Sequence, residues 1–351
     1  MGEEAGSAAL RETVGTRSPD RALPGEKKER TLIMRLRTNS RSADFAFVAT
    51  LLLLGLLLAP GTARAQGDGP HNLPLIPINT NIFTPQVLVL SGNFIPAMTA
   101  VVPGATVDVV AVPITYIRTF ALGSHFGRLF VVLPVSTLDA TADVFDPIRG
   151  QDRSVDKGRS GIMDPMVTLH IGLAGAPALK PMEFMKHPKS FQMVAIAGVG
   201  MPFGTYDSSR LINLGTNRWT IRTGIGTVFP FGEQKRTALE MSNNLYFFTK
   251  NSDVRGADYR QQDPLYVMEN HLTHNFTKKA WGSVDARYQY GGAVATDGVS
   301  DHSWTNALGG GGTFGYQFTL HFGAWTSLDK VLLKSGDAKE TMFRFQIAYS
   351  F

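Results

Sequence analysis

The last eleven residues, 341–351, alternate between large apolar side chains and polar or small ones. The apolar set is Phe343, Phe345, Ile347, Tyr349 and Phe351, and the intervening positions include Arg344 and Gln346. Because successive side chains of a strand point to opposite faces, this period of two predicts a strand with one apolar and one polar face. A strand of about 9–11 residues is long enough to cross a bilayer. The pattern therefore predicts the closing strand of an outer-membrane β-barrel.

Segments of similar length and character recur along the chain, separated by polar intervals rich in Gly and Asp. The candidate strands are 82–92, 106–119, 127–138, 164–175, 190–202, 217–229, 237–249, 265–275, 280–291, 303–315, 319–327 and 341–351. No stretch beyond Ala65 keeps a 3.6-residue apolar period or approaches 18 apolar residues, which excludes a helical membrane protein. Bacterial single-chain barrels have an even number of strands. The sequence predicts an all-β fold, a transmembrane antiparallel up-and-down β-barrel of about 12 strands, with counts of 10–14 also compatible.

The intervals between the strands differ in length, as expected for a barrel with short periplasmic turns and longer external loops. If Phe351 is periplasmic, the external intervals are 139–163, 203–216, 250–264, 292–302 and 328–340, and the periplasmic ones include 120–126, 230–236 and 275–279. The interval 176–189 breaks the rule, because it is long for a periplasmic turn. The alternation offers no explanation for it.

An apolar run, residues 45–59, lies near the N-terminus. It follows Arg35, Arg37 and Arg41 and precedes the small-residue site Ala63-Arg64-Ala65. These are the three parts of a signal peptide, with cleavage expected after Ala65; a single anchoring helix is the alternative, but the run is short for a span of about 20 residues. We expect 1–33 to be a disordered or mis-called leader with Met34 as the true start, 34–65 the signal peptide and 66–351 the barrel.

Composition narrows the function classes. The 351 residues include no cysteine, which removes disulfides, thiol catalysis and cysteine metal sites. The formal net charge is +5, but residues 1–65 hold ten basic and seven acidic side chains, which leaves +2 for the remainder. A charge so close to zero gives no reason to expect nucleic-acid binding.

Charged and polar side chains fall on the predicted inward faces of several strands. The candidates for the lumen or solute path are Arg222, Glu240, Glu269, His271, Asp285, Arg287, Arg344 and Gln346. Of these, Arg344 and Gln346 are expected to face Asp285 and Glu269 across a narrow bore. One interpretation is a satisfied polar network that plugs the lumen. The other is a constriction that selects solutes by size and charge. Asn243, on the supposed lipid side, is an exception that a β-bulge would explain.

Other chemistry is weakly signalled. Residues 310–315 match the G-x-G-x-x-G string, but no helix follows, so the favoured interpretation is that glycine lets a strand bend or relieves crowding in a narrow barrel. His271 and His274 would lie on opposite faces of a strand, so no metal site is expected. No catalytic residue and no cofactor is assigned. The tryptophans near strand ends, Trp281 among them, are expected at the membrane interface.

Three motifs carry a family resemblance. They are residues 160–165 (Ser-Gly-Ile-Met-Asp-Pro), 201–207 (Met-Pro-Phe-Gly-Thr-Tyr-Asp) and 213–219 (Asn-Leu-Gly-Thr-Asn-Arg-Trp). In this order the chain resembles, from about Pro70 to Phe351, the outer-membrane barrel family named for the MetA pathway of phenol degradation; Met163 departs from the usual motif and should affect only packing. The resemblance implies a transporter-like role, sometimes encoded among genes for aromatic-compound breakdown.

The same motifs supply loop-gate candidates, namely Asp164, Asp207, Asn213, Asn217 and Arg218. Gly204 and Gly215 are expected to provide special backbone angles where strands pass into an external loop. The motifs could simply fold that loop, or they could form part of a solute gate.

The leading hypothesis is passage of small, hydrophobic or aromatic solutes across the outer membrane. A non-conducting barrel whose external loops, especially 139–163, bind a surface partner is the alternative, and a lipid-acting serine–histidine enzyme is a weaker third. The expected partners are outer-membrane lipid, a small solute and the barrel-assembly machinery, which would recognise Phe351.

Overall fold

The computed structural model describes residues 68–92, 94–95, 100–101, 105–146, 151–210, 213–300, 304–334 and 340–351. The expected leader, signal peptide and cleavage site lie outside these residues. Among the described residues, no helix is long and apolar enough to cross a membrane.

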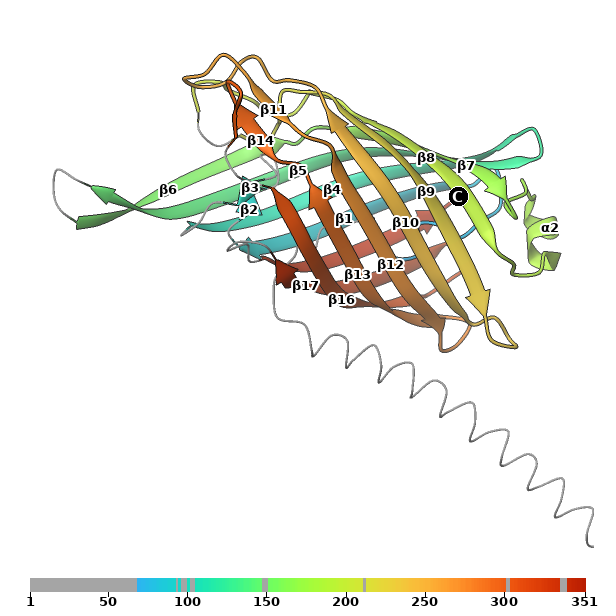
Figure 1. Ribbon diagram of the computed structural model, residues 1–351. Helices are drawn as coiled ribbons and strands as arrows, with labels where there is room; N and C mark the ends of the chain where they lie inside the picture. Colours follow the sequence, from blue (N-terminus) through green and yellow to red (C-terminus); the bar gives the residue numbers. More distant parts are fainter. Residues whose placement is uncertain are drawn as a thin grey trace, which may run out of the picture. The chain divides into compact units, whose positions relative to one another are not determined.

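The described chain forms a closed antiparallel barrel (Figure 1). Its strands are β1 (Asn81–Gly92), β4 (Ala105–Leu122), β5 (His125–Asp146), β6 (Gln151–Ile162), β7 (Met166–Ala174), β8 (Gln192–Gly200), β9 (Thr220–Phe231), β10 (Thr237–Phe248), β12 (Leu265–Asn275), β13 (Ala280–Gly291), β16 (Thr305–Gln317), β17 (Phe322–Lys334) and β18 (Glu340–Ser350). Strands β6 and β7 both pair with β5 and share one place in the wall, so the barrel has twelve strand positions. The predicted fold class and strand count are confirmed.

The last strand closes the barrel as predicted. Strand β18 pairs antiparallel with β1, with Gln346 opposite Gln86, and the Phe351 N–H donates to the Asn81 carbonyl at 2.9 Å. Along β18, Arg344 is 3% exposed and Phe345 is 44% exposed. The outer apolar face is therefore the surface that meets lipid, and the polar face lines the lumen.

The two ends of the barrel differ, and we name them by their connections. At the short-turn end lie both the start of β1 and the end of β18, with turns such as 232–236 and 276–279. At the long-loop end lie the segments 201–210, 213–219 and 249–264, together with short strands: β2 (Phe94–Ile95), β3 (Ala100–Val101), β11 (Arg260–Gln262), β14 (Val294–Thr296) and β15 (Val299–Ser300). This is the asymmetry that the sequence predicts.

Two intervals expected to be loops are largely strand. Strands β5 and β6 pair from Val135 opposite Ile162 to Asp146 opposite Gln151, and they extend past the other strands as a two-stranded ribbon (Figure 1). Strand β17 likewise continues to Lys334. In both places the ladder of backbone hydrogen bonds outlasts the apolar alternation from which the strand ends were predicted.

The exceptional interval 176–189 contains the one α-helix of the described residues, α2 (Pro181–Lys186). Its flank is hydrogen bonded to the short-turn end: Phe126 N–H donates to the Ala176 carbonyl at 3.0 Å, and Ala178 N–H donates to that of Ser124 at 2.9 Å. The Leu179 carbonyl accepts from Ile78 N–H at 2.8 Å. The interval is long because it covers this end of the barrel and holds the segment that precedes β1.

The structure explains one exceptional side chain, Asn243, and corrects the expected place of another, Trp281. Asn243 does point outward, and no bulge is needed, because the Tyr266 hydroxyl donates to its side-chain carbonyl at 2.6 Å and the register of β10 and β12 is unbroken. Trp281 is only 8% exposed and stacks on His71 with ring centroids 4.0 Å apart. Its expected place at the membrane interface is wrong, since an aromatic partner inside the barrel buries it.

Candidate functional site in the barrel lumen

A segment that precedes β1, residues 68–80, lies inside the barrel; we call it the N-terminal segment. Its three prolines, Pro70, Pro74 and Pro77, remove backbone donors and prevent it from joining a strand ladder. Its apolar side chains pack in a cluster with inward-facing residues of the wall. That cluster comprises Leu73, Leu75, Ile78, Phe126, Ala176, Val194, Ile196 and Val228. The segment therefore fills the lumen near the short-turn end.

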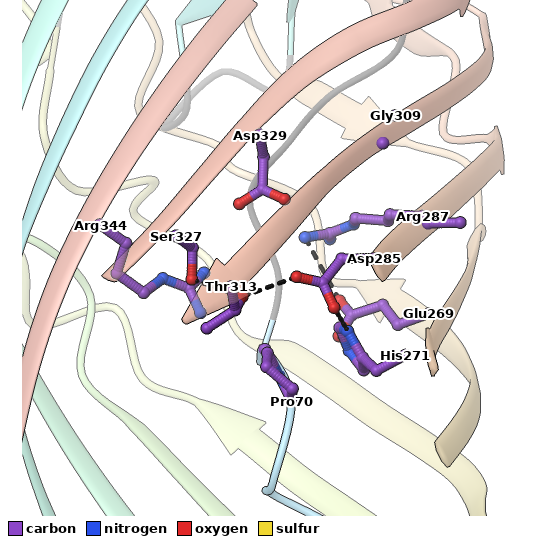
Figure 2. A pocket seen from close by; sticks show the side chains of 13 residues that line it. Pro70, Glu269, His271, Asp285, Arg287, Gly309, Thr313, Ser327, Asp329 and Arg344 are labelled. Atoms are coloured by element: carbon purple, nitrogen blue, oxygen red, sulfur yellow. Dashed lines mark hydrogen bonds and ion pairs between the residues drawn. The ribbon is translucent and has the colours of Figure 1, made fainter. Parts of the chain in front are cut away.

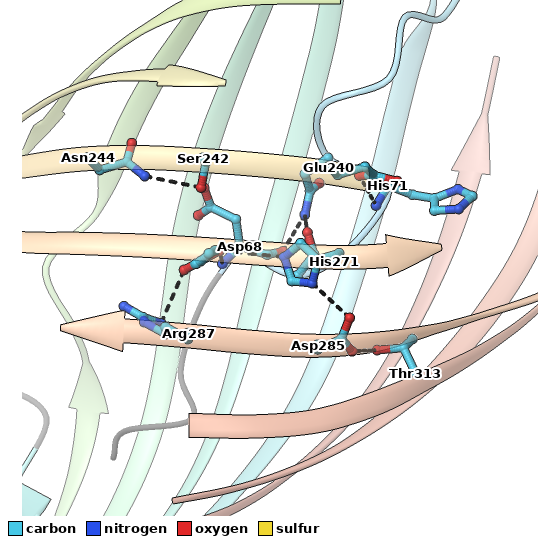
Figure 3. A network of polar contacts seen from close by, with 12 residues as sticks. Asp68, His71, Glu240, Ser242, Asn244, His271, Asp285, Arg287 and Thr313 are labelled. Carbon is cyan, nitrogen blue, oxygen red and sulfur yellow. Dashed lines mark hydrogen bonds and ion pairs between the residues drawn. The ribbon is translucent and has the colours of Figure 1, made fainter. Parts of the chain in front are cut away.

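Charged side chains of the wall bind the first half of this segment, residues 68–74 (Figure 3). Arg222, which is 4% exposed, forms a two-pronged ion pair with Asp68, one prong measuring 3.2 Å. Carboxylates of the wall accept from the segment's backbone: Asp68 N–H donates to Glu269 at 3.0 Å and His71 N–H donates to Glu240 at 2.9 Å. Such charge-assisted bonds are stronger than neutral ones, so they fix the segment.

Arg128 adds a second anchor. Its guanidinium donates to the carbonyls of Asn72 and Pro74, and it lies 5.0 Å from the ring centroid of Phe126. The side chain is 3% exposed. Four charged side chains from four different strands, Arg128, Arg222, Glu240 and Glu269, thus converge on residues 68–74.

On the other side of the lumen, polar side chains form a connected network (Figure 2). His271 Nδ1 lies 2.8 Å from Asp285, whose other oxygen accepts from the Thr313 hydroxyl at 2.6 Å. Thr313 also lies 2.8 Å from the Ser327 hydroxyl. Glu269 forms an ion pair with Arg287 at 3.3 Å. The network surrounds a cavity of about 30 Å³, which is enough for two or three waters.

The glycine run of β16 borders this network. A Cβ on Gly311 would lie 2.2 Å from the Asp329 carboxylate, and one on Gly315 would lie 2.2 Å from the Trp281 ring. The run is strand, with no helix after it. Relief of crowding is therefore confirmed as the reason for these glycines.

A larger cavity of about 170 Å³ lies beside the N-terminal segment, against the wall made by β1, β4, β5, β7 and β18. Its apolar lining is Leu88, Pro113, Ile117, Phe130, Val132 and Met166. Its polar lining is Asp68, Asn72, Thr84, Gln86, Thr115, Thr168, His170, Arg222, Arg344 and Gln346. An apolar protein cavity of about 150 Å³ holds benzene, so this space matches a single aromatic ring.

All eight predicted lumen residues point into the barrel, and all except Arg287 are at most 8% exposed. The structure does not bring them into one group. Arg344 borders both cavities, but Gln346 donates to Thr84 at 2.7 Å and lines only the larger one. The expectation that Gln346 faces Asp285 and Glu269 is wrong, because the N-terminal segment lies between these two parts of the lumen.

Sequence reasoning missed four interior groups: Asp68, Arg128, His170 and Asp329. Asp329 was missed because β17 was expected to end at residue 327. Arg128 carries a signal that could have found it, because it is a lone charge at an inward position between Phe126 and Phe130. Among the described residues no cluster of His, Asp and Glu could hold a metal ion.

The loop-gate candidates lie at the long-loop end and hold it together. Asp164 accepts from Gly204 N–H at 2.9 Å and from Thr216 N–H at 2.8 Å. A Cβ on Gly204 would lie 2.7 Å from the Gly215 Cα, and neither glycine has a positive φ. The expected special angles are wrong: these glycines allow two backbones to touch.

The other candidates extend the same loop. Asn213 accepts from Asp207 N–H at 2.9 Å, and Ser209 and Arg210 contact the Asp207 carboxylate, holding its pKa below its usual range. Asn217 donates to Asn251 at 3.0 Å. Arg218 donates to Gln262, and burial lowers its pKa to about 10. These contacts are what a loop-folding motif requires; a gating role for these residues stays a prediction.

A solved outer-membrane channel shares this fold. The COG4313 outer membrane channel from Pseudomonas putida F1 is 16% identical, covers 81% of this chain and 100% of its own, and superposes with a TM-score of 0.67. The translocator domain of the autotransporter NalP from Neisseria meningitidis (10% identical, 89% and 98% covered, TM-score 0.47) and the CymD monoaromatic hydrocarbon channel (9% identical, 83% and 97% covered, TM-score 0.39) are more distant.

A comparison with curated protein sequences finds no match. The model of the family described as "Putative MetA-pathway of phenol degradation" matches residues 92–330. That span includes the three motifs from which the resemblance was first drawn. The chain belongs to this family of outer-membrane barrels.

Proposed function

We propose that this barrel lets small hydrophobic or aromatic solutes pass across the outer membrane by a passive or facilitated route. The observation that carries the proposal is the cavity of about 170 Å³ beside the N-terminal segment. Its apolar lining is suited to a ring, and Arg222, Arg344 and Gln346 supply polar partners in the same lining. The family description and the likeness to an outer membrane channel of Pseudomonas putida F1 support it.

The lumen residues have distinct roles in this proposal. Arg222 and Arg344 would face the solute, whereas Glu240 and Glu269 would act through the N-terminal segment whose backbone they hold. His271, Asp285 and Arg287 belong to the network on the far side and would set its shape. The route along the larger cavity therefore depends on the side chains of β1, β4, β5, β7 and β18.

A matched pair of variants tests this route. Val132 lines the larger cavity, and its neighbour Val131 is 38% exposed on the outer face. Val132→Trp should fill the cavity and bring the permeability of liposomes to a phenol or benzoate close to that of protein-free liposomes. Val131→Trp should leave it unchanged. Equal permeability of the two variants would contradict the proposal.

A non-conducting barrel is the second candidate, and one observation favours it. The N-terminal segment and the network of His271, Asp285 and Thr313 occupy much of the lumen among the described residues. In that case the purified protein would show no conductance in planar bilayers and no effect on liposome permeability. The extended β5–β6 ribbon would then be the surface available to a partner.

The contacts in the lumen do not favour an enzyme. In a serine hydrolase the histidine lies between the nucleophile and the carboxylate. Here Asp285 lies between His271 and Thr313, and Ser327 is bonded to Thr313. The weak third hypothesis predicts lipid hydrolysis by the solubilised protein, and we expect none.

We also infer signal-peptide cleavage after Ala65. The position of Asp68 inside the barrel supports it, because only two residues would then precede Asp68 in the mature chain. The mass of the protein extracted from outer membranes checks the site directly. A mass that includes residues 34–65 would contradict it.

A further inference from the structure

A pocket unrelated to the lumen cavities lies at the long-loop end, between the segments 201–210, 213–219 and 249–260. Its volume is about 70 Å³. Its lining is Tyr206, Arg210, Asn213, Gly215, Thr216, Arg218, Asn251, Val254, Arg255 and Arg260. The set contains four arginines and no carboxylate. We call it the arginine pocket.

The arginines of this pocket are only partly neutralised. Arg210 forms an ion pair with Asp207 at 2.6 Å. Arg218, Arg255 and Arg260 form no ion pair with a carboxylate among the residues that the structure describes. Asp164 attracts Arg218 from beyond ion-pair distance, but the three positive charges around one small space still repel one another, so the folded loop gains stability when an anion enters.

Arg218 gives the pocket a built donor. It is 6% exposed, its guanidinium lies 4.5 Å from the ring centroid of Phe248, and one nitrogen donates to Gln262. Its Nε is buried and has no hydrogen-bond partner. A buried donor without a partner costs free energy, so a small shift of the Arg218 side chain toward an oxyanion in the pocket would lower that cost.

Size and geometry restrict the ligand. A single water needs about 10–15 Å³ of such space, so about 70 Å³ accommodates a group of the size of a carboxylate or phosphate. Planar guanidinium groups bind both in a two-pronged manner. Asn213, Asn251 and Tyr206 add neutral polar groups at the border.

We propose that the arginine pocket binds a small oxyanion, with the carboxylate of an aromatic acid as the class that it fits best. This site goes beyond the proposed passage of solutes and does not require it. If passage also occurs, the pocket would concentrate acidic solutes at the long-loop end. The pocket would then favour benzoate-like acids over neutral ring compounds of the same size.

Binding of 4-fluorobenzoate to the detergent-solubilised full barrel, followed by ¹⁹F NMR, tests the site, with 4-fluorobenzyl alcohol as the neutral isostere. We expect saturable binding of the acid alone. Arg218→Gln should weaken it about tenfold, the loss expected for one charge-assisted hydrogen bond. Because Arg218 also packs in the loop, the exposed Arg255→Gln provides a second variant, with a smaller loss expected.

The matched control is Arg236→Gln, an exposed arginine at the short-turn end that should bind as the parent does. Competition by inorganic phosphate distinguishes the two sources of oxyanion. If phosphate displaces 4-fluorobenzoate at a lower concentration than unlabelled benzoate does, the site is assigned to phosphate groups. The proposal is overturned if neither anion binds saturably, if the alcohol binds equally, or if both pocket variants bind as Arg236→Gln does. If the parent protein binds the anion but does not make liposomes permeable, the result contradicts the proposed passage of solutes and leaves the anion site supported.

Discussion

At the scale of single residues, the contact between Arg222 and Asp68 joins the wall to the N-terminal segment. Arg222 is buried in β9, and its charge is compensated by a carboxylate 154 residues earlier in the chain. Removing one member of such a pair leaves the other without its partner in a place of low polarity. The pair therefore contributes to the stability with which the first half of the N-terminal segment is bound to the wall.

Asp68→Asn is expected to loosen the segment without unfolding the barrel. The cost should be about 2 kcal/mol, below the value for a fully buried pair because the Asp68 side chain is 39% exposed. Hydrogen–deuterium exchange should show faster exchange at His71 and Leu75, whose N–H groups are bonded to the wall, than in the parent. Unchanged exchange at these two N–H groups would mean that Arg128 and the apolar cluster are sufficient to hold the segment in place.

At the scale of elements, the strands were predictable and the N-terminal segment was not. Strands such as β12 and β18 keep a period of two, which placed Glu269 and His271 on the inner face correctly. The segment 68–80 has no such period, and its prolines fit neither a strand nor a helix. Its partners come from far along the chain: Asp68 contacts Glu269, and His71 contacts Glu240.

The same contrast holds for the candidate site. Alternation assigns a side chain to the inside of a barrel, but it does not say which inward residues meet, because that depends on strand tilt and on what fills the lumen. Arg344 and Gln346 are neighbours on one face of β18, yet only Arg344 reaches the network of Asp285. The N-terminal segment, which separates Gln346 from the network of Asp285, has no periodic pattern from which its position could be predicted.

Shortening the N-terminal segment tests its role as an element. A mature chain that begins at Leu75 keeps the apolar cluster of Leu75 and Ile78 but lacks Asp68 and His71. We expect a larger unit conductance in planar bilayers than for the full mature chain, because the part of the lumen near Arg222 is emptied. An unchanged conductance, with a strand content by circular dichroism equal to the parent, would show that the constriction lies elsewhere.

At the scale of the whole molecule, closure depends on both ends of the barrel sequence. Strand β1 pairs with β18, and the backbone of Phe351 exchanges hydrogen bonds with that of Asn81 at 2.9 and 3.0 Å. Phe351 is 60% exposed, and its ring packs beside that of Tyr349. Closure uses the backbone of the last residue, while its ring remains available to another protein.

Phe351→Ala separates these two roles. The variant keeps the backbone bonds to Asn81, so refolding of the purified chain into detergent should be close to that of the parent. If the assembly machinery recognises the ring, the amount in the outer membrane of cells should fall several-fold. Equal amounts in cells would contradict that partner, and a loss of refolding in vitro would instead assign the ring to stability.

The N-terminal segment also has a thermodynamic consequence for any solute in the barrel. Asp68 is tied to the wall through the dozen residues that lead to β1, and a short tether gives a group an effective concentration in the millimolar range. A solute carboxylate that reaches Arg222 therefore competes with the Asp68 carboxylate, which remains tethered nearby. A solute carboxylate with the same intrinsic affinity for Arg222 would displace Asp68 from half of the molecules only at a millimolar concentration. The fraction of barrels with solute at Arg222 would therefore rise with the solute concentration outside the cell.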